Sequence, residues 1–315
     1  MAFQDQLVLR VAELYYKQEI SQQEIAKIIG VSRPTVSRII QEARKRGFVN
    51  ITINTPVELN YELSNELKEK FGLKDVLVVK VENENSPETL KRVGYVASRF
   101  LLSLLDSKEM IGISWGRTIK KVVETIPETD LTDVEVIQLV GSLGSGGPAI
   151  DGPELAYKRA EHFQGTYKYI NSPAVVSEKQ VKDALLEQQP IQEVLQAAEK
   201  CDIVMMSFGA IEEENSSLHR SGYLDEEKRK AYVEKGAVGH ILAQMINKDG
   251  EIVRLPDNYV IGIPLESLQE KKWSIGVVAH SFKDEVTLGA IRGKYINALV
   301  IDEFTANKLK AACES

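Results

Sequence analysis

The stretch SQQEIAKIIGVSRPTVSRIIQEARKRG, residues 21–47, constrains the fold more than any other part of the chain. Ser21 stands three residues before Glu24, the spacing of a capping box at a helix start. Gly30 follows the apolar residues of that short helix, and glycine commonly ends a helix in the left-handed conformation. Ser32 is placed to cap a second helix, in whose first turn Pro34 is tolerated. The sequence therefore predicts two short helices joined by a tight turn.

Apolar spacing extends this pattern to a three-helix unit. Leu7, Val11 and Leu14 recur at helical intervals ahead of the stretch and predict a first helix. Ala26 is small enough for two helices to cross closely, and Val36 would fill the wedge between them. This is the layout of a helix-turn-helix, whose second helix enters the major groove of DNA.

The outward face of that second helix supplies the candidate DNA-binding residues. Arginine binds guanine edges, hydroxyls bind bases or phosphates, and a basic helix end binds the DNA backbone. The candidates are Ser32, Arg33, Thr35, Ser37, Arg38, Gln41, Arg44, Lys45 and Arg46. The alternative is a small three-helix element that packs on another surface and never contacts DNA.

The charge distribution favours DNA binding by this first part of the chain. The 315 residues carry a net charge of −7, yet residues 1–50 hold eight basic and five acidic side chains, a net +3. The remainder has a net charge of −10. Opposite balances indicate two regions with different partners. We expect a DNA-binding domain at 1–54, a linker at 55–60 and a larger domain at 61–315.

Composition argues against several other classes of protein. The apolar runs are too short to cross a bilayer, and the amino terminus lacks the features of a signal peptide. The two cysteines, Cys201 and Cys313, form neither a disulfide framework nor a zinc-binding pattern. We expect a cytoplasmic protein with no membrane partner, no metal site and no cofactor.

The larger region alternates apolar strands with amphipathic helices. This alternation is typical of a doubly wound, largely parallel α/β sheet covered on both faces. Strands are predicted at 76–81, 110–115, 134–141, 167–170, 202–209, 273–279 and 298–302. Helices are predicted at 88–105, 116–126, 153–163, 178–200 and 226–246. A further pattern at 61–71 fits either a connecting helix or a short dimerisation seam, and 48–54 alternates like a strand.

Two loops that follow predicted strands suit an anion. In SWGRT, Gly116 allows close backbone approach, and Arg117 and Thr118 open a helix whose start carries partial positive charge. The next strand leads into GSLGSGG, where Gly141, Gly144 and Ser145 give a loop free to wrap a phosphate. Ligands of parallel sheets bind beyond the carboxyl ends of the strands, so a phosphate-bearing ligand is predicted here. Neither loop matches a dinucleotide or P-loop motif.

The chain as a whole resembles the SorC family of bacterial transcription regulators. The motifs that carry the resemblance are SQQEIAKIIGVSRPTVSRII, SWGRT, VIQLVGSLG, SSLHRSGYLDEE and LGAIRGKYINALVIDE. The resemblance implies an effector domain similar to sugar-phosphate isomerases and deaminases. It also implies a homodimer or homotetramer that binds operator DNA, with an affinity that a phosphorylated sugar controls. We expect a repressor of a carbohydrate-use operon, and the residues leave activation open as the alternative.

The resemblance adds effector-binding candidates and also three departures. It implies that Arg220, Lys283 and, more weakly, Lys294 reach the effector. Val140 stands where one branch of the family has a lysine that forms an imine with its sugar, so imine chemistry is not expected there. Where the family has an acidic residue followed two positions later by an arginine, this chain has Asp257-Asn258-Tyr259. Asp257 remains a candidate, but the arginine that would contact the effector is missing. A customary double glycine is replaced by His280-Ser281.

Two other functions remain open from the residues alone. A sugar-phosphate isomerase or deaminase with an appended DNA-binding head would need a general acid or base, for which Asp151, Glu154, His240 and Asp257 are candidates. His240 is expected along a helix face in a structural role. A site-specific recombinase would need a nucleophilic serine or tyrosine, but Tyr15 and Tyr16 fit the apolar pattern of the first helix. We favour a regulator without catalytic activity.

Overall fold

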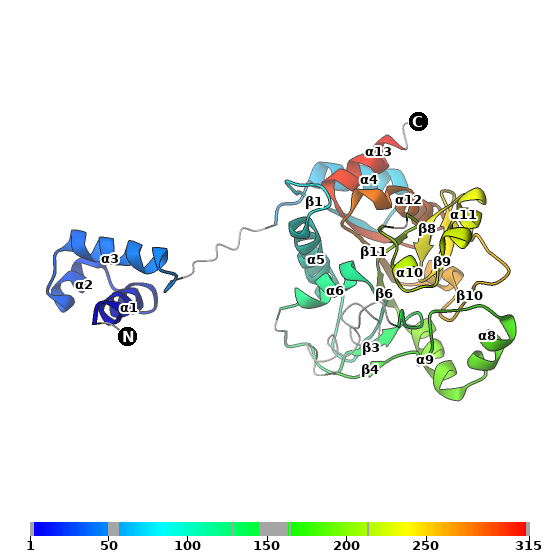
Figure 1. The fold of residues 1–315 in the computed structure, drawn as a ribbon, viewed down its shortest axis with the longest axis horizontal. Helices are drawn as coiled ribbons and strands as arrows, with labels where there is room; N and C mark the ends of the chain where they lie inside the picture. The colour runs from blue at the N-terminus through cyan, green and yellow to red at the C-terminus, as the bar shows by residue number, and fades with distance from the viewer. Residues whose placement is uncertain are drawn as a thin grey trace. The chain divides into compact units, whose positions relative to one another are not determined.

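The computed structural model describes residues 3–49, 57–127, 129–144, 163, 165–212 and 214–312. The chain divides into two compact units, Met1–Pro56 and Val57–Ser315, each of which has its own hydrophobic core (Figure 1). None of the helices within the described ranges is both long and apolar enough to cross a bilayer. Parts of the predicted strand 48–54 and of the predicted helix 153–163 lie outside the described residues.

Within its described residues, the first unit contains three helices, α1 (Phe3–Tyr16), α2 (Gln22–Ile29) and α3 (Arg33–Lys45). The capping box is present: Ser21 Oγ accepts from the Glu24 amide at 3.3 Å, while the Glu24 carboxylate accepts from the Ser21 amide. Gly30 ends α2 at φ +79°, in the left-handed region that favours glycine. Ser32 Oγ accepts from the Thr35 amide and starts α3. Local hydrogen bonding therefore fixes the turn between α2 and α3.

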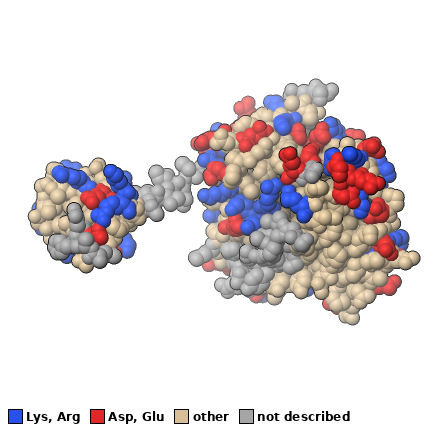
Figure 2. All heavy atoms as spheres, in the orientation of Figure 1, with Lys and Arg blue, Asp and Glu red and all other residues tan. Residues whose placement is uncertain are grey.

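Apolar packing holds the three helices together and leaves the polar side of α3 exposed. Val11, Ile25, Ala26, Val36 and Ile40 form the buried centre. Figure 2 shows Lys and Arg side chains gathered over α3. Arg33, Arg38 and Lys45 on α3 are exposed and have no ion pair among the described residues.

Residues 57–60, predicted as linker, belong to the second unit. Leu59 forms an antiparallel bridge with Val79. Asn60 caps α4 (Tyr61–Phe71) and also donates to Glu303 Oε1 at 2.6 Å. Leu63 and Leu67 of α4 are buried in the core of this unit, so this helix offers no free apolar seam for dimerisation.

Among the described residues, seven parallel strands form the main sheet in the order β1-β12-β11-β6-β2-β3-β4. Their bounds are β1 Asp75–Val79, β2 Met110–Ile113, β3 Glu135–Gln138, β4 Tyr167–Lys168, β6 Ile203–Met206, β11 Trp273–Val278 and β12 Ala298–Asp302. The central strands are buried on both faces, as the continuous apolar runs predict. The predicted largely parallel α/β fold is confirmed.

Helices cover both faces of this sheet. α5 (Pro87–Leu102) and α6 (Arg117–Glu124) follow β1 and β2, and right-handed crossovers place them on one face. α9 (Gln189–Lys200) and α12 (Asp284–Arg292) belong to connections that run back across the sheet and therefore cover the other face (Figure 1). The direction of the connections reverses between β2 and β6. Such a reversal opens a crevice at the carboxyl ends of the two strands.

The remaining elements are short. They are β5 Val175–Val176, α8 Lys179–Leu186, β7 Gly209–Ala210, α10 Ser217–Arg220, α11 Glu226–Glu234, β8 Ala237–Ile241, β9 Gln244–Asn247, β10 Tyr259–Val260, α13 Glu303–Ala311 and the 3-10 helices η2 Leu265–Glu270 and η3 Ser281–Lys283. β7, β8 and β9 form a three-stranded antiparallel sheet, and β10 pairs with β5.

Two predicted helices are wrong in extent. The predicted helix 226–246 ends at Glu234 as α11 and continues as the hairpin β8–β9, whose turn residues Leu242 and Ala243 have φ of +47° and +64°. Two positive-φ residues match a tight hairpin turn, which glycine and asparagine normally signal. The predicted helix 178–200 is divided into α8 and α9, because Pro190 lies in the first turn of α9 and interrupts any helix that precedes it.

The cap of α2 generates a prediction. Replacing Ser21→Ala removes the acceptor for the Glu24 amide and should lower the opening free energy of α2 by about 1 kcal/mol. Hydrogen exchange of the α2 amides in the full chain measures this quantity. Gln23→Ala, an exposed change in the same helix, is the control and should not lower it. Equal exchange in the two variants would show that the capping box is not stabilising.

Candidate functional site

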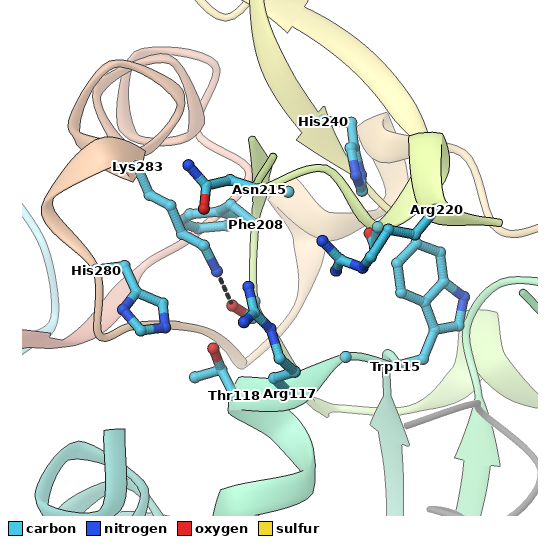
Figure 3. Close-up of a pocket in the computed structure, with 13 residues that line it drawn as sticks. Trp115, Arg117, Thr118, Phe208, Asn215, Arg220, His240, His280 and Lys283 are labelled. Carbon is cyan, nitrogen blue, oxygen red and sulfur yellow. Dashed lines mark hydrogen bonds between the residues drawn. The ribbon is translucent and has the colours of Figure 1, made fainter. Parts of the chain in front are cut away.

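A pocket lies at the reversal point of the sheet, between the loops that follow β2 and β6. Two hydrogen bonds tie the strand ends: the Ser114 amide donates to the Met205 carbonyl at 3.1 Å, and the Ser207 amide donates to Ser114 Oγ at 3.3 Å. The lining residues are Trp115, Gly116, Arg117, Thr118, Ser207, Phe208, Gly209, Asn215, Ser217, Arg220, His240, His280 and Lys283 (Figure 3). The loops after three central strands therefore meet at one site.

The start of α6 gives this pocket a positive end. Gly116 precedes the helix with φ +116°, a backbone angle that a residue with a side chain rarely adopts. The first amides of a helix lack partners within it, and no side chain caps α6. Thr118 in this first turn is buried and lines the pocket. An anion at this position would bind unpaired amides and favourable partial charge.

Three cationic side chains converge on the same space. Arg117 comes from α6, Arg220 from α10 and Lys283 from η3 (Figure 3). Lys283 is 8% exposed and donates to Ser207 Oγ at 3.2 Å. Burial, aided by Arg117 and Arg220, lowers the pKa of Lys283 to about 7. Burial, aided by Arg117, also lowers the pKa of Arg220. Among the described lining residues there is no carboxylate to balance this charge.

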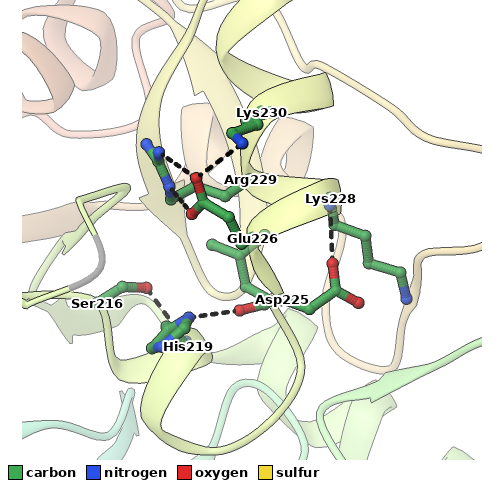
Figure 4. A network of polar contacts seen from close by, with 8 residues as sticks. Ser216, His219, Asp225, Glu226, Lys228, Arg229 and Lys230 are labelled. Atoms are coloured by element: carbon green, nitrogen blue, oxygen red, sulfur yellow. Dashed lines mark hydrogen bonds and ion pairs between the residues drawn. The ribbon is translucent and has the colours of Figure 1, made fainter.

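A polar network orders the segment that carries Arg220. Ser216 Oγ caps α10 by accepting from the His219 amide, and His219 Nδ1 lies 2.8 Å from the Leu224 carbonyl oxygen. Asp225 caps α11, where Glu226 forms a two-bond ion pair with Arg229 (Figure 4). The motif SSLHRSGYLDEE therefore folds as two capped turns that hold Arg220 at the pocket.

Two buried histidines complete the lining. His240 lies on β8 with 2% exposure, and His280 follows β11 with 8% exposure. None of their four ring nitrogens has a hydrogen-bond partner among the described residues. Burial lowers the pKa of His240 to about 3, assisted by Lys283. Burial lowers the pKa of His280 to about 4, assisted by Lys283 and Arg117. Both imidazoles are therefore neutral near pH 7.

The placement of His240 differs from the sequence-based expectation of a helix face. Its ring lies over Gly209, where an added Cβ would be 1.8 Å from His240 Nε2. The Trp115 ring lies 5.8 Å from the His240 ring, centroid to centroid. Trp115 is itself anchored, because its Nε1 donates to the Gly141 carbonyl at 3.0 Å. His240 therefore lines the pocket from the β8–β9 hairpin, which the sequence does not predict.

Five predicted effector residues line the pocket together: Gly116, Arg117, Thr118, Arg220 and Lys283. Sequence reasoning missed Ser207, Phe208 and Gly209, because the predicted strand 202–209 included them, whereas β6 ends at Met206 and leaves them in the loop that lines the pocket. Asn215 and Ser217 were not chosen either, although Asn215 ends the acidic run EEEN and Ser217 lies in the motif SSLHRSGYLDEE.

Other predicted effector residues lie elsewhere. Asp257 is exposed and pairs with Lys228 at 3.5 Å, beside a separate hollow. Lys294 is exposed beyond the far end of α12. Gly141 packs against backbone, since an added Cβ would be 2.4 Å from the Pro173 carbonyl oxygen, and Gly144 does not line the pocket. Ser145, Asp151 and Glu154 lie outside the described residues.

Volume alone would favour a different hollow. The pocket at the strand ends holds about 40 Å³, whereas a hollow beside β9 and β10 holds about 450 Å³. The larger hollow is lined by the cations Lys179, Lys182 and Arg254 but also by the carboxylates Asp183 and Glu266, and Lys179 pairs with Asp183 at 2.6 Å. The smaller pocket has the unbalanced charge and the unpaired ring nitrogens. Its present volume fits only a few water molecules, so a larger ligand must displace exposed side chains such as Arg117.

The predicted DNA-binding residues divide into two groups. Arg44 Nε donates to Tyr16 Oη at 2.6 Å. Arg46 pairs with Asp5 and with Glu42. These two arginines are thus engaged within the unit, whereas Arg33, Arg38 and Gln41 are exposed on α3. Ser32 and Thr35 bond to each other at 2.8 Å across the helix start, and Ser37 is half-buried.

Comparisons with known proteins agree with both units. A family model described as "Putative sugar-binding domain" matches residues 55–310, and a "Crp-like helix-turn-helix domain" model matches residues 7–60. The deoxyribonucleoside regulator of Bacillus subtilis is 32% identical, over 96% of this chain and 97% of that protein. The sorbitol operon regulator of Klebsiella pneumoniae is 26% identical, over 96% of this chain and 97% of that protein.

A solved structure extends the similarity to the fold. The full-length sorbitol operon regulator SorC from Klebsiella pneumoniae superposes with a TM-score of 0.79 at 25% identity, covering 98% of this chain and 99% of that one. The predicted resemblance is confirmed. The chain is a transcription regulator with a helix-turn-helix and a sugar-binding domain, and it belongs to the SorC family.

Proposed function

We propose that this protein is a cytoplasmic repressor of a carbohydrate-use operon, and that a phosphorylated sugar bound at the strand-end pocket controls its affinity for operator DNA. The observation that carries the proposal is the convergence of Arg117, Arg220 and Lys283 at the start of α6, without a carboxylate among the described lining residues. A phosphate would balance this charge and bind the unpaired helix amides. The sugar would occupy space that opens between the loops when exposed side chains such as Arg117 move.

The DNA-binding half of the proposal rests on α3. Its exposed Arg33, Arg38 and Gln41 face away from the buried stripe of Val36 and Ile40. A homodimer or homotetramer would present two such helices to successive major grooves, about 34 Å apart. A ligand that alters the separation of the two helices would change operator affinity. The same ligand must then bind the free and DNA-bound forms with different affinities.

Two of the predicted acid–base candidates, His240 and Asp257, do not favour catalysis at this pocket. A general base works best with a pKa near the operating pH, and the pKa of His240 is lowered to about 3. Asp257 lies outside the pocket and pairs with Lys228. A recombinase is not supported either, because the Tyr15 and Tyr16 rings pack against the hydrophobic core of the first unit. The relatives above are named regulators.

The DNA-binding role of Arg38 is testable. Arg38→Ala should weaken binding to DNA upstream of the protein's own operon by about five- to 150-fold, if the guanidinium contacts a base. Gel-shift or anisotropy titration at a fixed salt concentration measures the affinity. Arg10→Ala, which removes an exposed arginine of α1, is the charge-matched control. A loss no larger than that of Arg10→Ala would remove Arg38 from the recognition surface.

The anion site generates a pH-dependent prediction. Burial and the two nearby arginines lower the pKa of Lys283 to about 7 when no ligand is bound. Above that pH the ammonium group increasingly loses its proton, and with it the attraction to a phosphate. We expect Lys283→Met to bind the best ligand of a panel of hexose and pentose phosphates more weakly at pH 6. The ratio of variant to wild-type Kd should fall as pH rises towards 9.

Titration calorimetry across this pH range measures both affinities. The phosphate titrates near pH 6 in both proteins, so its own ionisation cancels in the ratio. A ratio that stays constant with pH, or equal affinities at pH 6, would show that the Lys283 charge does not bind the ligand. Wild-type protein that binds none of these compounds would contradict the phosphorylated effector itself.

A further inference from the structure

We propose that His240 and His280 bind hydroxyl groups of the effector, so that the ligand is a polyhydroxylated sugar or polyol whose only charged group is a single phosphate. The inference rests on the proposed phosphate site and deepens it. It assigns the part of the ligand that is not phosphate, and it excludes sugar acids and bisphosphates as the preferred class.

Hydrogen-bonding capacity carries the argument. A neutral imidazole has one N–H donor and one acceptor nitrogen, so the two rings offer two donors and two acceptors. All four nitrogens are buried, and none has a partner in the part of the chain that the structure describes, although both residues line the pocket. Buried polar atoms in folded proteins nearly always have a partner, so this pair requires one from a ligand or from water. The partner must supply donors as well as acceptors.

Hydroxyl groups meet this requirement, whereas anions do not. A phosphate or carboxylate oxygen that has lost its proton only accepts hydrogen bonds, so it leaves the acceptor nitrogen of each imidazole unpaired. A hydroxyl both donates and accepts, and a sugar carries several. The cationic residues Arg117, Arg220 and Lys283 already provide donors for one phosphate. A second anionic group would lie against neutral rings and gain less.

The two rings are held in place before the ligand binds. His240 lies over Gly209, which has no side chain to displace the ring, and against Trp115. His280 stacks on Phe282 with ring centroids 5.1 Å apart and planes 11° apart. Binding therefore requires little ordering of these side chains, which favours selectivity. Figure 3 shows the two rings on different sides of the cationic group, so each can reach a different part of one ligand.

The backbone at His280 tolerates substitution. The backbone of His280, at φ −147° and ψ 126°, is ordinary extended chain that glycine or leucine also adopts. Substitution at this position can therefore change the ligand without straining the backbone.

The experiment compares two probes on matched variants. The probes are inorganic phosphate and the tightest-binding compound of a panel containing aldose, ketose and polyol monophosphates, sugar acids and sugar bisphosphates. The variants of the full chain are His280→Leu, which removes both hydrogen-bonding atoms, and His280→Gln, which restores a donor and an acceptor. His240→Leu and His240→Gln form the second pair. Calorimetry gives each Kd, and thermal unfolding without ligand shows whether each variant is folded.

We expect the tightest probe to be a monophosphate without a carboxylate. Each leucine variant should bind it about three- to tenfold more weakly, while its affinity for inorganic phosphate changes less than twofold. The glutamine variants should recover part of the loss. This pattern requires an interaction with the sugar, because a merely structural role would alter both probes together.

Three results would overturn the inference. They are a sugar acid or bisphosphate as the tightest probe, leucine variants that keep full sugar affinity, and leucine variants that lose both probes equally. Should one leucine variant fail to fold, the pair at the other histidine decides. Failure of the phosphate site is distinguishable, because Lys283→Met would then leave both probes unaffected. Lys283→Met is expected to weaken both.

Discussion

Unbalanced positive charge in a partly buried pocket is the interaction on which the functional part of this structure depends. Burial of Lys283 disfavours its ammonium, and the nearby Arg117 and Arg220 add like-charge repulsion. The fold tolerates this because the hydrogen bonds between the ends of β2 and β6 fix the loops where the sheet connections reverse. Such an arrangement is stabilised by an anion. Binding of an anion should also draw a proton onto Lys283, which links the ligand to the acidity of its surroundings.

The pocket is connected by direct contacts to the beginning of the second unit. Lys308 Nζ of α13 donates to the Ser281 carbonyl at 3.2 Å, one residue after His280. Two residues further along α13, Lys310 pairs with Glu66 of α4 at 2.7 Å. α4 begins directly after the segment that leads from the DNA-binding unit. Such a chain of contacts can couple the two sites only if both the ligand and DNA change the arrangement of its residues. In that case the ligand changes the affinity for DNA, and DNA changes the affinity for the ligand by the same factor.

Local features were predictable from the sequence, and long-range convergence was not. The capping box at Ser21 and the left-handed Gly30 depend on neighbouring residues, and the structure confirms both. The parallel strands were recognisable because their apolar runs are buried on both faces. The hairpin that carries His240 was missed, because Leu242 and Ala243 adopt positive φ without any glycine or asparagine to indicate a turn. Asp257 and Lys294 were chosen by family resemblance, and the structure places them outside the pocket, since motif similarity does not determine where a side chain lies.

The contact between Gly209 and His240 constrains how these two positions can change in evolution. Any side chain at position 209 would occupy the volume of the imidazole at position 240. A lineage that gains a methyl group at position 209 must move or lose the ring at position 240, whereas a lineage can lose the ring and keep the glycine. Gly209 is therefore a precondition for an imidazole at position 240, and replacement of this glycine is expected only after the ring has been lost.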